Sequence, residues 1–138
     1  MKSVSLSDRG DVRIFLEKQF SRWAADKAIG DETLIETAEE AFNGNVDADL
    51  GGYLFKMRLA REGKGKSGGY RTIICFRKSD SDRIFFLHGF PKNSKGNITA
   101  KEEKALKLVA KSMVKLSDDQ VAELEKAGAI RALRRAGQ

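Results

Sequence analysis

The spacing of apolar residues changes along this chain, from a helical period in its first third to a strand period in its middle. Within residues 8–26, apolar side chains recur three and four positions apart, at Val12, Phe15, Leu16, Phe20 and Trp23. Gly30 interrupts this pattern, and Asp31 can cap a second helix that stops at Asn43-Gly44. The sequence therefore predicts two consecutive helices, preceded by a short edge strand at residues 1–6.

Three runs of alternating apolar and polar residues follow, at 53–59, 70–76 and 83–90. In the first run, Tyr53, Phe55, Met57 and Leu59 are expected on one face of the strand and Lys56 and Arg58 on the other. The links between the runs are short, which favours an antiparallel meander over parallel crossovers.

Two capping boxes predict helices near the C-terminus, one at Thr99-Glu102 and one at Ser117-Gln120. The first of these helices is expected to turn inward Leu106, Val109, Met113 and Leu116. The second is expected to run to about Lys126, with frayed chain from Gly128. The predicted fold class is α+β: a small antiparallel sheet packed against the N-terminal helices, followed by C-terminal helices.

Length and composition limit the chain to one domain. Its 138 residues suffice for a single core, with residues 1–116 as the main part and 117–138 as a helical extension of the same domain. A single Cys and a single His exclude a disulfide framework and a zinc-ligand cluster, so we expect no metal or cofactor. The chain contains no apolar run of about 20 residues and no secretory signal, which predicts a soluble, cytoplasmic protein without a membrane segment.

Positive charge is concentrated in residues 56–95. This stretch holds eleven Lys or Arg and three acidic residues, a net charge of +8, whereas the rest of the chain has a net charge of −2. A sheet face rich in Arg and Lys is suited to binding a polyanion, of which nucleic acid is the commonest. The alternative, a solubilising surface, usually mixes both signs of charge.

Lys56, Arg58 and Arg71 are the first candidates for a functional site. The first two project from one strand and Arg71 begins the next, so all three are expected to converge on one sheet face. Guanidinium and ammonium groups fixed there could hold a phosphate and neutralise charge that develops in a transition state. The alternative is ion pairing with the acidic face of the second helix, formed by Glu32, Glu36, Glu39 and Glu40.

His88 is the side chain whose ordinary pKa suits proton transfer near neutral pH. Alternation places it with Ile84 and Phe86, which favours a buried structural histidine. Gly89 and Pro91 follow, so a bulge or strand end could re-aim the ring. Next come Phe90, Lys92 and Asn93, where an aromatic ring could stack on a base and polar groups could reach phosphate.

Gly65-Lys66-Ser67 resembles only the end of a phosphate-binding P-loop. The full pattern needs a glycine where Ala60 stands, and a helix where a strand is expected, so nucleotide hydrolysis is excluded. We interpret residues 62–69 as a basic hairpin loop whose glycines allow close approach to a phosphate. The predicted RNA contacts are Arg61, Lys64, Lys66, Arg77, Phe90, Asn93 and Lys95.

Two segments resemble the RelE/ParE superfamily of type II toxin–antitoxin toxins, nearest its RelE/HigB-like branch. They are GKGKSGGYRTI, which ends at Ile73, and RIFFLHGFPKN, which ends at Asn93. The resemblance covers roughly residues 1–116 in element order. It implies a microbial-RNase-like fold and a metal-independent, ribosome-dependent mRNA endonuclease that inhibits translation and is held inactive by a cognate antitoxin.

The resemblance also implies roles for single residues. Lys56 and Arg58 would serve acid–base or phosphate chemistry, Arg71 would bind the scissile phosphate, and Lys92 would assist the leaving group. Arg58 stands where relatives have a lysine, and arginine is a poor proton acceptor. Many relatives have a tyrosine after the segment around Lys92, whereas this chain has Ile98 nearby. His88 could therefore substitute as the base.

Two other functions remain open from the sequence. A ParE-like inhibitor of DNA gyrase would need no phosphate site, and a non-catalytic RNA-binding module would need no proton transfer. Cleavage of translated mRNA separates the endonuclease from both. The expected partners are the ribosome, mRNA and an antitoxin encoded by a small adjacent gene for a helix-turn-helix protein.

Overall fold

A computed structural model describes residues 13–61, 65–77, 83–92 and 98–134. In chain order, the elements within these ranges are β1 (Arg13–Glu17), α2 (Lys18–Asp26), α3 (Asp31–Phe42), β2 (Ala48–Gly51), β3 (Leu54–Arg61), β4 (Gly65–Cys75), β5 (Arg83–Pro91), α4 (Ala100–Met113), α5 (Asp118–Lys126) and β6 (Ile130–Leu133). The edge strand predicted at residues 1–6 lies outside the described residues.

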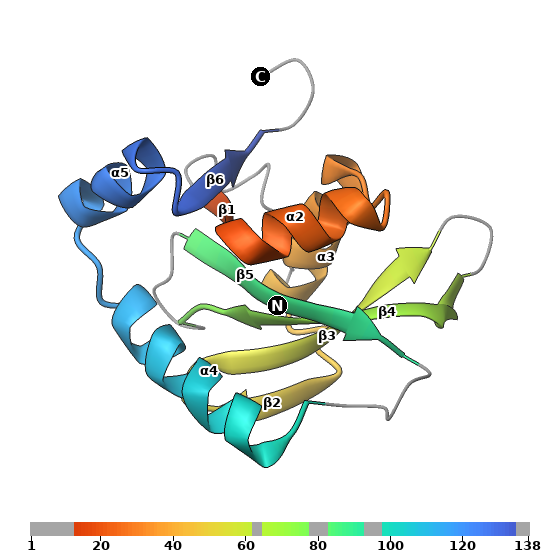
Figure 1. The fold of residues 1–138 in the computed structure, drawn as a ribbon. Coiled ribbons are helices and arrows are strands. Elements are labelled where there is room, and N and C mark those ends of the chain that lie inside the picture. Colours follow the sequence, from red (N-terminus) through yellow and green to blue (C-terminus); the bar gives the residue numbers. More distant parts are fainter. Residues whose placement is uncertain (1–12, 62–64, 78–82, 93–97, 135–138) are drawn as a thin grey trace.

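The strands form one sheet in the order β2-β3-β4-β5-β1-β6. Strands β2 to β5 pair antiparallel in succession, which confirms the meander predicted for β3, β4 and β5, whereas β1 pairs parallel with β5 and antiparallel with β6. Helices α2 and α3 lie on one side of this sheet and α4 on the other (Figure 1). The predicted α+β class is confirmed, with the correction that one strand pair is parallel.

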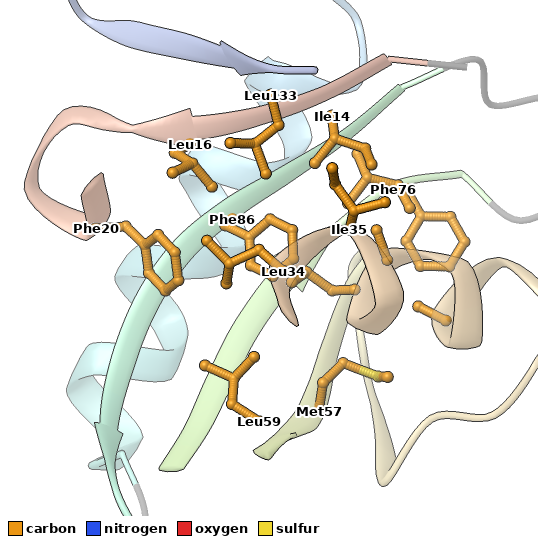
Figure 2. Close-up of a cluster of buried hydrophobic side chains, with 14 of the residues drawn as sticks. Ile14, Leu16, Phe20, Leu34, Ile35, Met57, Leu59, Phe76, Phe86 and Leu133 are labelled. Atoms are coloured by element: carbon orange, nitrogen blue, oxygen red, sulfur yellow. The ribbon is translucent and has the colours of Figure 1, made fainter. Parts of the chain in front are cut away.

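The sheet face under α2 and α3 carries the larger hydrophobic cluster (Figure 2). Phe55, Met57 and Leu59 of β3 are all at most 3% exposed and belong to this cluster, which confirms the alternation predicted for the strand. Tyr53 departs from it. This residue lies in the turn before β3, with a φ of +69°, and is 41% exposed.

The opposite sheet face packs against α4 and α5, through Ala110 and Val121 respectively. Both predicted capping boxes are present and begin these two helices. Val109 was predicted to point inward but is 42% exposed, because Ala110 takes the buried position on α4. Cys75 lies in this cluster, and burial raises the pKa of its thiol to about 12, which keeps it an uncharged core residue as predicted.

Residues 13–17 form strand β1 instead of the predicted start of a helix. Ile14, Phe15 and Leu16 are all buried, because β1 lies between β5 and β6 with helices on both sheet faces. A strand covered on both faces reads as a continuous apolar run, and a run this short also fits a helical period. The helix therefore begins only at Lys18.

The C-terminal segment also differs from its prediction. Helix α5 is confirmed, but residues 130–133 form β6 and pair with β1 where frayed chain was expected. Its two end residues, Ile130 and Leu133, are buried on opposite sides of the sheet. The C-terminal segment therefore completes the core and is not purely helical. Strand β2, at the other edge of the sheet, was not predicted either.

Candidate active site on a basic sheet face

The pairing of β3 with β4 brings the predicted basic residues together. Arg58 lies directly opposite Arg71, and Lys56 lies opposite Ile73. Residues opposite each other on antiparallel strands project from the same face. The predicted convergence of Lys56, Arg58 and Arg71 is therefore confirmed, on the face that also carries α4 and α5. The Arg58 side chain is 50% exposed, whereas that of Arg71 is only 12% exposed.

A β-bulge in β5 brings His88 to the same face. Ile74 pairs with Phe86 but Ile73 pairs with His88, so Leu87 is an extra residue between these two pairs. The strand alternation is therefore inverted after Leu87, and His88 shares the face of Ile73 and Lys56. The expectation that His88 is buried beside Ile84 and Phe86 was wrong for this reason, and its side chain is partly exposed.

Thr72 holds the carbonyl group of His88 at this bulge. Its hydroxyl donates a hydrogen bond of 2.8 Å to the His88 carbonyl oxygen, and Thr72 itself is fully buried. A bulge disrupts the regular ladder locally, and the Thr72 hydroxyl supplies a donor to the backbone there. Nothing in the strand pattern of the sequence distinguished Thr72 from its apolar neighbours.

Phe90 continues this face towards the end of β5, and Lys92 follows directly after the strand. Phe90 pairs with Arg71, and its ring stacks on the His88 ring with a centroid distance of 5.9 Å. Phe90 also packs against the cluster under α4, so its ring is partly a core element. The Lys92 amide donates to the Gly69 carbonyl oxygen at 3.4 Å, and the residue is exposed.

Gly89 faces the other way and allows α2 to approach the sheet. A Cβ atom at this position would lie 2.3 Å from Cζ3 of Trp23. The Trp23 ring also meets the ring of Tyr70, edge to face, at a centroid distance of 5.3 Å. Gly89 is therefore required by packing, a role that the sequence did not indicate.

Asp47 is the anionic partner of the two arginines. Its Oδ2 atom accepts a hydrogen bond from Arg58 Nε at 3.2 Å and lies 3.6 Å from Arg71 Nε. The alternative expectation, pairing with the acidic face of the second helix, does not describe Arg58 and Arg71. Asp47 precedes the unpredicted strand β2, so no periodic signal marked it.

Arg71 retains hydrogen-bonding capacity. Its Nη1 atom is buried and has no hydrogen-bond acceptor among the described residues. Buried donors without an acceptor are uncommon and often belong to functional sites. An anion that reached this group would supply the missing acceptor.

Glu102 is the glutamate of the capping box that begins α4. Its pKa is lowered, first by the hydrogen bond from the Thr99 amide, then by that from the Thr99 hydroxyl, and to a smaller extent by His88.

The other predicted RNA contacts are placed as follows. Arg61 and Lys66 lie in β3 and β4 by their backbone, and Lys64, Asn93 and Lys95 lie outside the described residues. Arg77 follows the far end of β4 from Arg71, and its Nη1 donates to the Val114 carbonyl oxygen at 3.5 Å. The fold therefore does not bring Arg77 to the site.

Asp47 and Arg58 also line a polar cavity of about 320 Å³ at the edge of the sheet. Its other lining residues are Glu40, Asn45, Val46 and Met57. Within the described ranges, no group of three His, Cys, Asp or Glu side chains is arranged to hold a metal ion. None of the four described helices combines the length and hydropathy of a membrane span.

The fold and the site define a class: a small α+β domain with a cationic sheet face suited to polyanions. The model of one family, described as the RelE toxin of the RelE / RelB toxin-antitoxin system, matches residues 12–133. The chain belongs to this RelE family and is the toxin of a toxin–antitoxin system. The match extends past residue 116 and includes α5 and β6. Membership implies an antitoxin as partner.

Proposed function

We propose that this toxin is an endonuclease that cleaves mRNA on the ribosome and thereby stops translation. The observation that carries the proposal is the convergence of Lys56, Arg58, Arg71 and His88 on one sheet face. The buried Nη1 atom of Arg71, which lacks an acceptor among the described residues, supports a phosphate there.

In the proposed reaction the ribose 2′-oxygen attacks the adjacent phosphorus and the bond from phosphorus to the 5′-oxygen breaks. The products are a 2′,3′-cyclic phosphate and a 5′-hydroxyl. Arg58 and Arg71 bind the non-bridging oxygens, and Lys56 adds positive charge as the phosphorus becomes pentacoordinate. No metal ion is needed in this scheme, because these side chains supply the positive charge.

We assign proton transfer to His88 and Lys92. His88 accepts the proton of the 2′-hydroxyl, since a neutral imidazole suits this role near neutral pH. Lys92 gives a proton to the leaving 5′-oxygen. Arg58, which stands where relatives have a lysine, contributes charge and no proton transfer. This is a weak set of acid–base groups, so alignment of the mRNA by the ribosome supplies a large part of the rate.

The test is a translation reaction with a defined transcript, analysed by primer extension with and without ribosomes. We expect cleavage only with ribosomes, and fragments whose 5′-hydroxyl accepts a label from polynucleotide kinase without prior dephosphorylation. Lys56→Ala and Arg71→Ala should abolish cleavage, whereas Arg22→Ala should not. Arg22 is an exposed residue of α2, so its replacement controls for loss of one positive charge.

Intact transcripts in the presence of ribosomes and folded toxin would reject the proposal. Inhibition of DNA supercoiling by the same preparation would then favour a gyrase inhibitor. Binding of RNA without cleavage would favour a non-catalytic RNA-binding module.

A further inference from the structure

Asp47 touches three of the residues to which the proposed function gives a role. Its carboxylate contacts Arg58 Nε and Arg71 Nε through the same oxygen, at 3.2 and 3.6 Å. Its backbone amide donates to the Lys56 carbonyl oxygen at 2.9 Å, which fixes the residue against β3. The Asp47 side chain is 26% exposed, so the carboxylate is partly withdrawn from water.

The pairing of β3 with β4 creates a need for such a carboxylate. Arg58 and Arg71 lie directly opposite each other, and like charges at opposed positions of antiparallel strands repel. The repulsion is weakly screened on the Arg71 side, where the side chain is only 12% exposed. A carboxylate between the two guanidinium groups offsets their repulsion and sets their orientation.

The atoms involved also matter. An arginine side chain has five N–H donors, one on Nε and four on the two Nη atoms. Asp47 accepts a hydrogen bond from Nε of Arg58 and forms an ion pair with Arg71 on its Nε side, which leaves the Nη groups of both for another anion. The Nη1 atom of Arg71, which has no acceptor in the described part of the chain, fits this arrangement. The cavity that Asp47 and Arg58 line leaves space beside the pair.

We propose that Asp47 is a positioning residue of the active site. It holds Arg58 and Arg71 by their Nε atoms so that the Nη groups of both arginines bind one RNA phosphate. The inference rests on the proposed function, in which that phosphate is the scissile one. Asp47 itself does not exchange a proton with the RNA and is not displaced by it.

The decisive variants are Asp47→Asn and Asp47→Ala. Both remove a negative charge from the basic face, so binding of a short RNA with a 2′-deoxy sugar at the scissile position should tighten. The slope of the logarithm of the binding constant against the logarithm of the salt concentration should steepen by about 0.7, as expected when a protein that binds single-stranded RNA gains one effective positive charge. Cleavage of ribosome-bound mRNA at saturating toxin should instead fall, by about 10- to 100-fold in Asp47→Ala. Asparagine keeps an oxygen acceptor, so Asp47→Asn should lose less.

Tighter binding with slower cleavage is a signature that a merely structural role does not give, because unfolding would weaken both. Asp26→Asn removes the same charge at the end of α2, where Asp26 pairs only weakly with Lys27 at 3.7 Å. This control should keep the cleavage rate of the parent. A second readout needs no cleavage: the Nε–Hε signals of Arg58 and Arg71 in ¹⁵N NMR should shift or broaden in Asp47→Asn and stay unchanged in Asp26→Asn.

Three outcomes would overturn the inference. Tighter binding with an unchanged cleavage rate would make Asp47 a competitor for the phosphate site. Loss of cleavage with unchanged Nε–Hε signals would make it the proton acceptor. Loss of binding, cleavage and the folded state together would make it purely structural. If the parent toxin cuts no mRNA but its Nε–Hε signals still depend on Asp47, the proposed endonuclease activity is rejected. The conclusion that Asp47 positions the two arginines is then kept.

Discussion

Gly89→Ala is the change for which the structure gives the clearest magnitude. A Cβ atom at position 89 would lie 2.3, 2.4 and 2.6 Å from three carbons of the Trp23 ring. Comfortable carbon–carbon contacts are about 3.5 to 4.0 Å, so each contact is short by about 1 Å or more. The ring has little freedom to move, because Phe20 and Tyr70 lie against it at centroid distances of 5.5 and 5.3 Å.

Overpacking of a core typically costs about 1 to 3 kcal/mol. We expect about 3 kcal/mol for Gly89→Ala, since a rigid ring and a paired strand oppose each other here. A domain of this size loses roughly 3 to 5 °C of melting temperature per kcal/mol, which predicts a decrease of about 10 °C. Because Gly89 lies between His88 and Phe90, the folded fraction should also cleave mRNA more slowly.

Thermal melting followed by circular dichroism tests this prediction in a double-mutant cycle. Trp23→Leu removes the ring that clashes, so Gly89→Ala should cost much less in that background than in the parent. The two costs should differ by about 2 kcal/mol, within the range measured for residues in contact. A Gly89→Ala variant that melts within about 2 °C of the parent would refute the packing argument.

Four further predictions concern the site and the partner. Thr72→Val should destabilise the toxin by about 1 to 3 kcal/mol, because it removes the buried donor to the His88 carbonyl oxygen. Thr72→Ser keeps the hydroxyl and should therefore cleave more mRNA per folded molecule than Thr72→Val does. His88→Gln should lower mRNA cleavage about 10²- to 10⁴-fold with little change in melting temperature. If the melting temperature and the cleavage fall together, His88 is a packing residue. The pKa of Glu102 is lower in the folded state than in the unfolded state, so its carboxylate stabilises the fold fully above the ordinary Glu pKa, and this stabilisation is lost as the pH falls through the lowered pKa. The free energy of unfolding, measured with denaturant, should therefore differ between Glu102→Gln and the parent at neutral pH and become the same in acid. Association of the antitoxin should slow with rising salt, because the chain has a net charge of +6 and a basic face, and a rate indifferent to salt would place the antitoxin elsewhere on the toxin.

The sequence by itself determined the features that depend on neighbouring residues. Strand alternation is local, so it correctly separated Lys56 and Arg58 from Phe55, Met57 and Leu59. Capping boxes are also local, since the two hydrogen bonds of each join residues three apart, and both were identified. The short links between the central runs were enough to predict their antiparallel pairing.

Tertiary structure decided what depends on residues far apart in the chain. Whether residues 13–17 form a helix or a strand depends on β5 and β6, which cover both edges of β1 and lie far away in the sequence. The bulge at Leu87 depends on the register with β4, and the sequence could only allow for it through Gly89 and Pro91. That single extra residue moved His88 from the expected core face to the basic face.

Asp47 is the clearest case of a residue that only the tertiary structure revealed. It lies outside the basic segment and carries the opposite charge, so a count of Lys and Arg in the sequence hides it. Pairing of β2 with β3 brings it beside Arg58, and pairing of β3 with β4 brings Arg71 to the same oxygen. The sequence set the sign of the charged face, whereas the strand register set which charges meet, because electrostatic contacts depend on distance in space and not along the chain.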